Sequence, residues 1–95
     1  PGTSPEDIEE LVVDPLEERI YALENIKRIK TSISDGIAIL NVEYKYDSDV
    51  DEKYQELVRE VNAIRGDLPQ DIARIEIKKL QPSNVNVVQV ALVSE

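Results

Sequence analysis

The apolar residues near the start of the chain recur every three or four positions, which is the spacing of one face of an α-helix. We predict such a helix from Pro5 to about Glu24. Ser4 is a suitable N-terminal cap, and proline is well tolerated at the first helical position. Pro15 removes a backbone hydrogen bond within the helix, so we expect a kink or two abutting helical pieces. The predicted buried stripe consists of Ile8, Leu11, Val12, Leu16, Ile20 and Leu23.

Two segments rich in β-branched residues follow, Lys27 to Ser34 and Ile37 to Tyr46. The Asp35-Gly36 dipeptide between them is the strongest short-range signal for a β-hairpin. In the second segment an apolar face alternates with a more polar one, and we expect the apolar face to pack against the helices. That face carries Ala38, Leu40, Val42, Tyr44 and Tyr46.

A second amphipathic helix is predicted from Val50 to Ile64. Asp49 is placed to cap it, and Glu52, three residues later, completes a capping-box-like pair. The Arg65-Gly66 step ends this helix, because Asp67-Leu68-Pro69 cannot continue it. The predicted buried stripe consists of Val50, Tyr54, Leu57, Val58, Val61 and Ile64.

Two further strands are predicted near the end of the chain. One runs from about Ala73 to Leu80, with Ile75 and Ile77 on its inner face. After a turn at residues 81–84, the other runs from Val85 to Val93. This last strand is apolar on both faces, which indicates a central position in a sheet or a second covering layer.

The predicted order α-β-β-α-β-β indicates an α+β fold of the ferredoxin-like type, an antiparallel sheet with two helices on one face. A complete fold of this type begins with one more strand. The chain opens instead on Pro1-Gly2 turn chemistry and a helix cap, with no initiator Met, so we expect an excised piece of a larger protein. A hairpin between the last two strands would place Val85–Val93 in the slot of the missing first strand, as in a circular permutant.

Composition then narrows the classes of function. The net charge is −9, from 20 acidic and 11 basic residues, so the chain repels nucleic-acid backbones and anionic lipid surfaces. It contains no His and no Cys, which removes the commonest general base, the thiolate nucleophile and the softer metal ligands. We therefore expect no nucleic-acid partner, no cofactor and no enzymatic activity. No apolar stretch approaches the roughly 20 residues that span a bilayer.

One acidic pattern imitates a metal site. Asp47, Asp49 and Asp51 match the first three alternating ligands of a calcium-binding loop. The positions that need Gly and a bidentate Glu are occupied by Glu52 and Val58, so helix capping is the favoured interpretation and no metal site is predicted.

Two carboxylate pairs, Glu9-Glu10 and Glu17-Glu18, could in principle supply an acid and a base. Adjacent helix positions point apart, however, and no apolar residues flank these pairs to raise a pKa. A solvated helix face is the favoured interpretation, and no catalytic residue is predicted.

Several motifs along the chain resemble a known transporter family. They are Pro1–Val12, Pro15-Leu16-Glu17-Glu18, Leu23–Ile29, Asp49-Val50-Asp51-Glu52 and the run Val61–Pro69, which reads Val-Asn-Ala-Ile-Arg-Gly-Asp-Leu-Pro. Together they resemble the porter region of resistance-nodulation-division efflux transporters, in the hydrophobe/amphiphile branch that includes the acriflavine-resistance pumps. The resemblance covers nearly the whole of the chain.

The resemblance implies the first porter subdomain on the N-terminal side, in the periplasmic portion of an inner-membrane protein. Residues 1–82 would be the subdomain proper, and residues 83–95 the strand leading toward the next subdomain. Transporters of this family are proton-driven homotrimers that export amphiphilic small molecules, together with a periplasmic adaptor and an outer-membrane channel. The helix Val50–Ile64 would then line the central pore. Its outward residues Gln55, Glu56, Arg59 and Asn62 would face the other subunits.

A second class of function stays open at this point. The chain could be a stand-alone ferredoxin-like module for ligand binding or regulation. An apolar helix encoded shortly upstream of Pro1 would favour the transporter, whereas a free-standing gene starting there would favour the module. A catalytic domain of this fold would need a polar pocket with perturbed carboxylates, and the sequence shows no sign of one.

Overall fold

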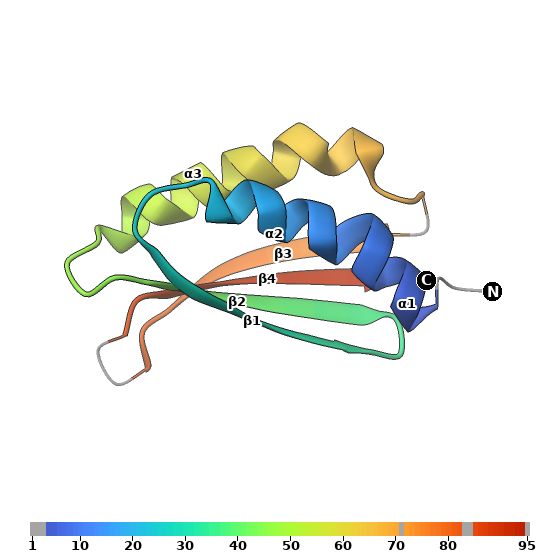
Figure 1. Ribbon diagram of the computed structural model, residues 1–95, viewed down its shortest axis with the longest axis horizontal. Coiled ribbons are helices and arrows are strands. Elements are labelled where there is room, and N and C mark those ends of the chain that lie inside the picture. The colour runs from blue at the N-terminus through green and yellow to red at the C-terminus, as the bar shows by residue number, and fades with distance from the viewer. Residues whose placement is uncertain (1–3, 71, 83–84, 95) are drawn as a thin grey trace.

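The computed structural model describes residues 4–70, 72–82 and 85–94, and these residues form two layers (Figure 1). Helices lie on one face of a four-stranded antiparallel sheet, which confirms the predicted α+β, ferredoxin-like arrangement. The elements in chain order are α1 (Pro5–Ile8), η1 (Glu9–Val13), α2 (Asp14–Tyr21), β1 (Ile26–Ser34), β2 (Ile37–Tyr44), α3 (Val50–Ile64), η2 (Arg65–Asp67), β3 (Ile72–Leu80) and β4 (Val87–Ser94).

The strands are ordered β1-β2-β4-β3, and each neighbouring pair is antiparallel. β4 therefore lies in the centre, with Val90 opposite Leu40 of β2 on one side and Ile77 of β3 on the other. This is the slot that the first strand fills in a complete ferredoxin-like sheet, so the predicted central position is confirmed. The strand starts two residues later than predicted, because the Val85 amide is used in a turn to the Pro82 carbonyl.

The predicted hairpin joins β1 and β2. Asp35 and Gly36 both have positive φ angles, 34° and 81°, as a two-residue turn of the type I′ class requires. The end of β4 packs against this turn, where the Ser94 amide donates to the Gly36 carbonyl at 2.7 Å. β2 ends at Tyr44, and the prediction that Tyr46 shares its buried face was wrong, because Tyr46 lies in the following turn and is 94% exposed.

The first helix begins as predicted and is then interrupted. The Asp7 amide donates to Ser4 Oγ at 3.1 Å, which is the expected cap. The backbone next widens into the π-helical segment η1, in which the Asp14 amide donates to the Glu9 carbonyl five residues back. Pro15 follows at once and has no amide to give, so the regular bonding pattern cannot pass through this point. The two abutting helical pieces predicted from Pro15 are thus confirmed, with a π turn as their junction.

The π turn also changes which side chains reach the core. An α-helix turns by about 100° per residue, so steps of four residues drift slowly round its surface. The wider turn absorbs this drift, and the side chains at four-residue steps, Ile8, Val12, Leu16 and Ile20, are all buried. Val13 joins them in the core. The prediction that Leu11 is buried was wrong, because this side chain points outward and is 53% exposed.

α3 has the predicted bounds, and most of its predicted stripe belongs to the core or packs against it. Val58 is the exception, because it is only half-buried and is not part of this cluster. Asp49 Oδ1 accepts hydrogen bonds from the Asp51 and Glu52 amides at 3.0 and 3.3 Å, which confirms the cap. The buried side chains of α3 form one core with the helix-facing residues of β2 and β4. Ile75 and Ile77 of β3 pack against this core. The buried core residues are Ile8, Val12, Val13, Leu16, Ile20, Ala38, Leu40, Val42, Tyr44, Leu57, Val61, Ile64, Val88, Val90 and Leu92.

Two predicted features fall partly or wholly outside the described residues. The opening Pro1-Gly2 turn is one, and residues 83–84 of the turn between β3 and β4 are the other. The remaining strand boundaries differ by one residue from prediction, since β1 begins at Ile26 and β3 at Ile72.

Deletion of residues 83–95 removes β4, leaving β2 and β3 without their shared neighbour. We expect the shortened chain to lose its cooperative thermal transition by circular dichroism, because the core loses the buried side chains of Val88, Val90 and Leu92.

A finer test replaces single residues on opposite faces of β4. Val90→Ser should destabilise by about 2–4 kcal/mol and Ala91→Ser by less than about 0.5 kcal/mol. A sharp transition in the deleted chain would contradict the central role of β4.

The two described glycines provide a matched pair. Gly36 has φ +81°, and a Cβ there would lie 2.8 Å from Ser94 Oγ, whereas a Cβ on Gly66 meets nothing within 4 Å. Gly36→Ala should therefore lower the free energy of unfolding by about 1–2 kcal/mol. Gly66→Ala should leave it unchanged or raise it by about 0.4–1 kcal/mol, because alanine restricts the unfolded chain. Urea denaturation of both variants checks the two signs, and equal effects would rule out the turn as the cause.

Candidate functional site

The outward surface of α3 holds three of the four residues predicted to face other subunits. Gln55, Arg59 and Asn62 are exposed and follow one another at the spacing of a single helix face. The Asn62 side-chain oxygen accepts two hydrogen bonds from the Arg65 guanidinium, at 3.2 and 3.1 Å. The structure therefore brings these side chains together in a polar, solvent-exposed row along α3.

Glu56, the fourth of these residues, has a different environment. Its side chain is only 25% exposed, and its Oε1 lies 3.2 Å from Nζ of Lys53 on the same helix. The Lys53 side chain is 5% exposed, so its ammonium group depends on this carboxylate as a partner. Glu56 thus forms an ion pair with Lys53 inside the domain, in addition to its predicted role of facing other subunits.

Sequence reasoning missed the burial of Lys53, although the signal was present. Position 53 lies four residues before Leu57 and eight before Val61, both of which are buried on the sheet side of α3. The helical period alone would have placed it on the buried face. The charge of lysine argued against that placement, because buried lysines need a partner such as Glu56.

A second buried polar group lies below α3, on β2. The Tyr44 hydroxyl is buried and has no hydrogen-bond partner among the described residues, and the whole residue is 2% exposed. Burial raises the pKa of the Tyr44 phenol well above its usual value, and the negative charge of Glu56 adds to this shift. Tyr44 therefore remains a neutral phenol throughout the physiological range.

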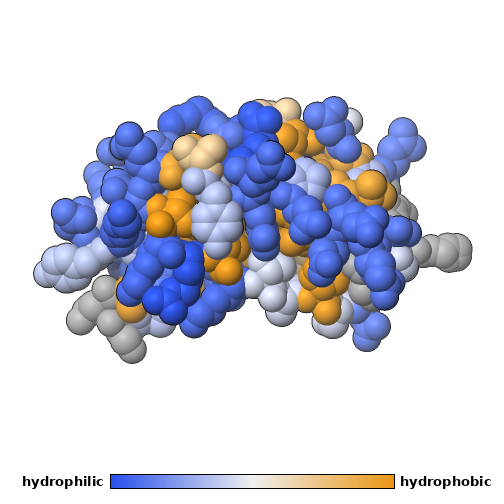
Figure 2. All heavy atoms as spheres, viewed as in Figure 1, coloured by the Kyte–Doolittle hydropathy of each residue, from blue (hydrophilic) through white to orange (hydrophobic). Residues whose placement is uncertain are grey.

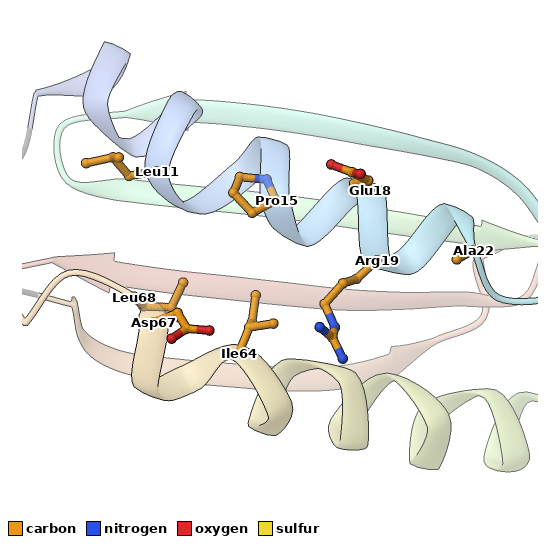
Figure 3. A pocket seen from close by; sticks show the side chains of 8 residues that line it. All are labelled: Leu11, Pro15, Glu18, Arg19, Ala22, Ile64, Asp67 and Leu68. Carbon is orange, nitrogen blue, oxygen red and sulfur yellow. The ribbon is translucent and has the colours of Figure 1, made fainter.

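A groove of about 510 Å³ lies between the first helix and α3 (Figure 3). Leu11, Pro15 and Ala22 line its first wall, and Ile64 and Leu68 line the opposite wall. Arg19 reaches across to α3, where its Nε lies 2.9 Å from Glu60 Oε1. Two carboxylates, those of Glu18 and Asp67, also line the groove, and neither forms an ion pair with another described residue.

The acidic patterns considered for chemistry have structural uses. Asp49 caps α3, and Asp51 Oδ1 lies 2.7 Å from Nζ of Lys79, whose pKa the Asp51 carboxylate raises. The capping interpretation of the aspartate pattern is therefore confirmed. Of the paired glutamates, Glu17 accepts a 2.5 Å hydrogen bond from the Thr31 hydroxyl of β1. Within residues 4–70, 72–82 and 85–94, no group of three acidic side chains is placed to hold a metal ion.

Comparison with known proteins shows the family. The model of the AcrB/AcrD/AcrF family matches residues 1–95, the full length of the chain. The chain belongs to the AcrB/AcrD/AcrF family. The resemblance to resistance-nodulation-division efflux transporters that the motifs predicted is thereby confirmed.

Individual members of the family are similar at low identity. The multidrug resistance proteins MdtC of Salmonella newport, Salmonella paratyphi B and Salmonella enteritidis are each 27% identical over 96 residues. The alignment covers 100% of this chain and 9% of each of these relatives, so the chain spans about a tenth of their length. None of the helices in the described part of the chain is long and apolar enough to cross a membrane.

The unpartnered hydroxyl of Tyr44 leads to a pH-dependent prediction. Because burial raises the folded-state pKa of Tyr44, the unfolded chain loses this proton more easily than the folded protein, so stability does not depend on this group below about pH 10 and falls progressively above it. Tyr44→Phe should weaken this alkaline loss and, by removing a buried unsatisfied group, raise stability at pH 7 by up to about 1 kcal/mol. Urea titrations from pH 7 to above pH 10 measure both effects. Tyr46→Phe is the control, since Tyr46 is 94% exposed. Destabilisation by Tyr44→Phe at pH 7 would mean that the hydroxyl is satisfied.

Proposed function

We propose that this chain is a periplasmic porter subdomain of a proton-driven, homotrimeric efflux transporter, and that it acts in assembly and the transport path, with no enzymatic role. The observation that carries the proposal is the match of the full chain to the AcrB/AcrD/AcrF family. The relatives named multidrug resistance proteins support amphiphilic small molecules as the exported substrates. In such a transporter a periplasmic adaptor and an outer-membrane channel would complete the route out of the cell.

Within this proposal, residues 1–82 form the subdomain proper and residues 83–95 form a strand that leads toward the next subdomain. The apolar character of both faces of β4 supports such a dual use. Val88, Val90 and Leu92 lie against the helices, while Val87, Ala91 and Val93 lie on the opposite face of the sheet. A strand with two apolar faces is suited to contacts with a second layer as well as with its own helices.

The role proposed for α3 is to line the central pore, with Gln55, Glu56, Arg59 and Asn62 toward the other subunits. Three of these side chains are exposed and polar, which suits a hydrated contact around an axis. The fourth, Glu56, pairs with Lys53 on the same helix, so a mutation of Glu56 would affect folding as well as assembly. Gln55 and Arg59 are therefore the better positions for probing the interface.

Cysteine cross-linking in the full-length transporter tests the orientation of α3. The chain contains no natural cysteine, so Arg59→Cys introduces one thiol in this region of each subunit. In a background free of other cysteines, we expect a short bifunctional maleimide to yield covalent dimers, because symmetry brings identical residues near an axis together. Ser32→Cys is the control, since Ser32 is exposed on β1 and on the sheet layer.

The comparison of the two variants decides the outcome. Cross-linked species from Arg59→Cys, with only monomer from Ser32→Cys, would support the pore position of α3. A transporter that is trimeric by light scattering but gives no Arg59→Cys product would contradict it. Cross-linking through Ser32→Cys instead would assign the subunit contact to the sheet layer.

A further inference from the structure

The groove between the first helix and α3 has three features that the proposed role of α3 does not use. It is lined mainly by apolar side chains, one of its walls is shaped by the irregular segment η1, and its free charges have one sign. No one of these features identifies a ligand by itself. Their combination at one place points to a ligand of defined chemistry.

The η1 segment places Leu11 at the groove. With regular α-helical bonding, the apolar stripe of the sequence would carry Leu11 toward the core. The π turn instead buries Val13 and leaves Leu11 53% exposed along the groove wall (Figure 3). π turns are rare and occur frequently at functional sites. A large aliphatic side chain held in solvent by such a turn is therefore a candidate contact for a partner.

The shape of the groove suits a helix. The first wall extends along the helix from Leu11 to Ala22, a rise of about 16 Å at 1.5 Å per residue, which is about three helical turns. The second wall, with Ile64 and Leu68, belongs to the end of α3 and the turn after it. A third helix packs naturally against the hollow between two others, with its apolar side chains at positions i, i+4 and i+7.

The charges around the groove select the sign of the occupant. The charged residues that line the groove are two carboxylates, Glu18 and Asp67, and one cation, Arg19, which is already paired with Glu60. Glu18 and Asp67 within the groove have no ion-pair partner among the described residues. Figure 2 shows apolar surface interleaved with hydrophilic side chains over the helix layer. An anionic membrane would be repelled by this charge.

We propose that this groove binds a basic amphipathic helix of a partner protein. The helix is about three turns long, inserts apolar side chains between Leu11 and Ile64, and places Lys or Arg near Glu18 and Asp67. Leu11 supplies the exposed apolar contact and the two carboxylates set the orientation. The proposal is independent of the pore position of α3, because the groove lies on the side of α3 that faces the first helix.

Binding of two designed peptides to the 95-residue chain tests the proposal. Both are helical and about 15 residues long, with leucine on one face, and they differ only in carrying Lys or Glu on the flanks. Fluorescence anisotropy should show saturable binding of the Lys peptide and none of the Glu peptide. Binding that does not saturate, or equal binding of both peptides, would overturn the proposal.

Matched variants locate the binding. Glu18→Lys should lower the affinity for the Lys peptide about tenfold, because it reverses a charge inside the groove. Glu9→Lys makes the same change in net charge on another flank of the helix, beside Val13 and Thr31. This variant should lower the affinity for the Lys peptide less than twofold. Equal losses from both variants would show that only the net charge matters, which would overturn the proposal.

The apolar contact has its own pair of variants. Leu11→Gln should weaken binding about tenfold, whereas Ile37→Gln, at an apolar residue 39% exposed on the sheet, should leave it unchanged. Circular dichroism of each variant confirms that it is folded. In the full-length protein, loss of the trimer on Glu18→Lys or Leu11→Gln would assign the groove to a subunit contact. That result would overturn the proposal that a partner helix binds there.

Discussion

β4 supplies hydrogen-bond partners to both β2 and β3, and the rest of the structure depends on this pairing. Without it the sheet would separate into a hairpin and a single strand, and neither would offer a surface wide enough to cover two helices. With this pairing, Val88, Val90 and Leu92 form the central part of the sheet face that packs against α2 and α3. The hydrogen bond from Ser94 to Gly36 then fixes the far end of β4 against the β1-β2 turn.

The π turn in the first helix satisfies two structural requirements. Pro15 interrupts the backbone bonding, while the apolar residues on either side of it must reach the same core. The π turn of η1 meets both requirements, because it ends the regular ladder just before Pro15 and rotates the chain into phase. The consequence is an exchange, in which Val13 enters the core and Leu11 moves to the groove. The same turn that accommodates proline therefore creates the apolar surface proposed to receive a partner.

Charge is distributed unevenly over the two layers. The carboxylates concentrate in the first helix, whereas the outer strands of the sheet carry most of the unburied cations, as in Arg28, Lys30, Arg74 and Lys78. Several of these cations pair with neighbouring glutamates, and the helix layer retains the excess negative charge. The two layers therefore favour different partners, and the helix layer combines unpaired carboxylates, Glu18 and Asp67, with a mainly apolar groove.

Much of the fold could be read from patterns that act over a few residues. The Asp35-Gly36 turn, the Asp49 cap and the alternating faces of β2 follow from local sterics and hydrogen bonding, and all were predicted. The central place of β4 was also predicted, because a hairpin between the last two strands places this strand, which is apolar on both faces, in the slot of the missing first strand. The exposed row on α3 follows from the helical period in the same way, although its role in assembly stays a proposal.

The sequence by itself therefore determined the order of the elements, their turns and caps, and the strand at the centre of the sheet, because these depend on short-range geometry and on apolar periodicity. Tertiary structure alone decided how the first helix passes Pro15, and thus that Val13 and not Leu11 is buried. That outcome depends on competition for space within the assembled core, which a local pattern does not show. For Lys53 the local pattern was informative, because the helical period places it on the buried face and Glu56 lies three residues further along the same helix. Only packing against the sheet decided that a lysine is accepted at this position.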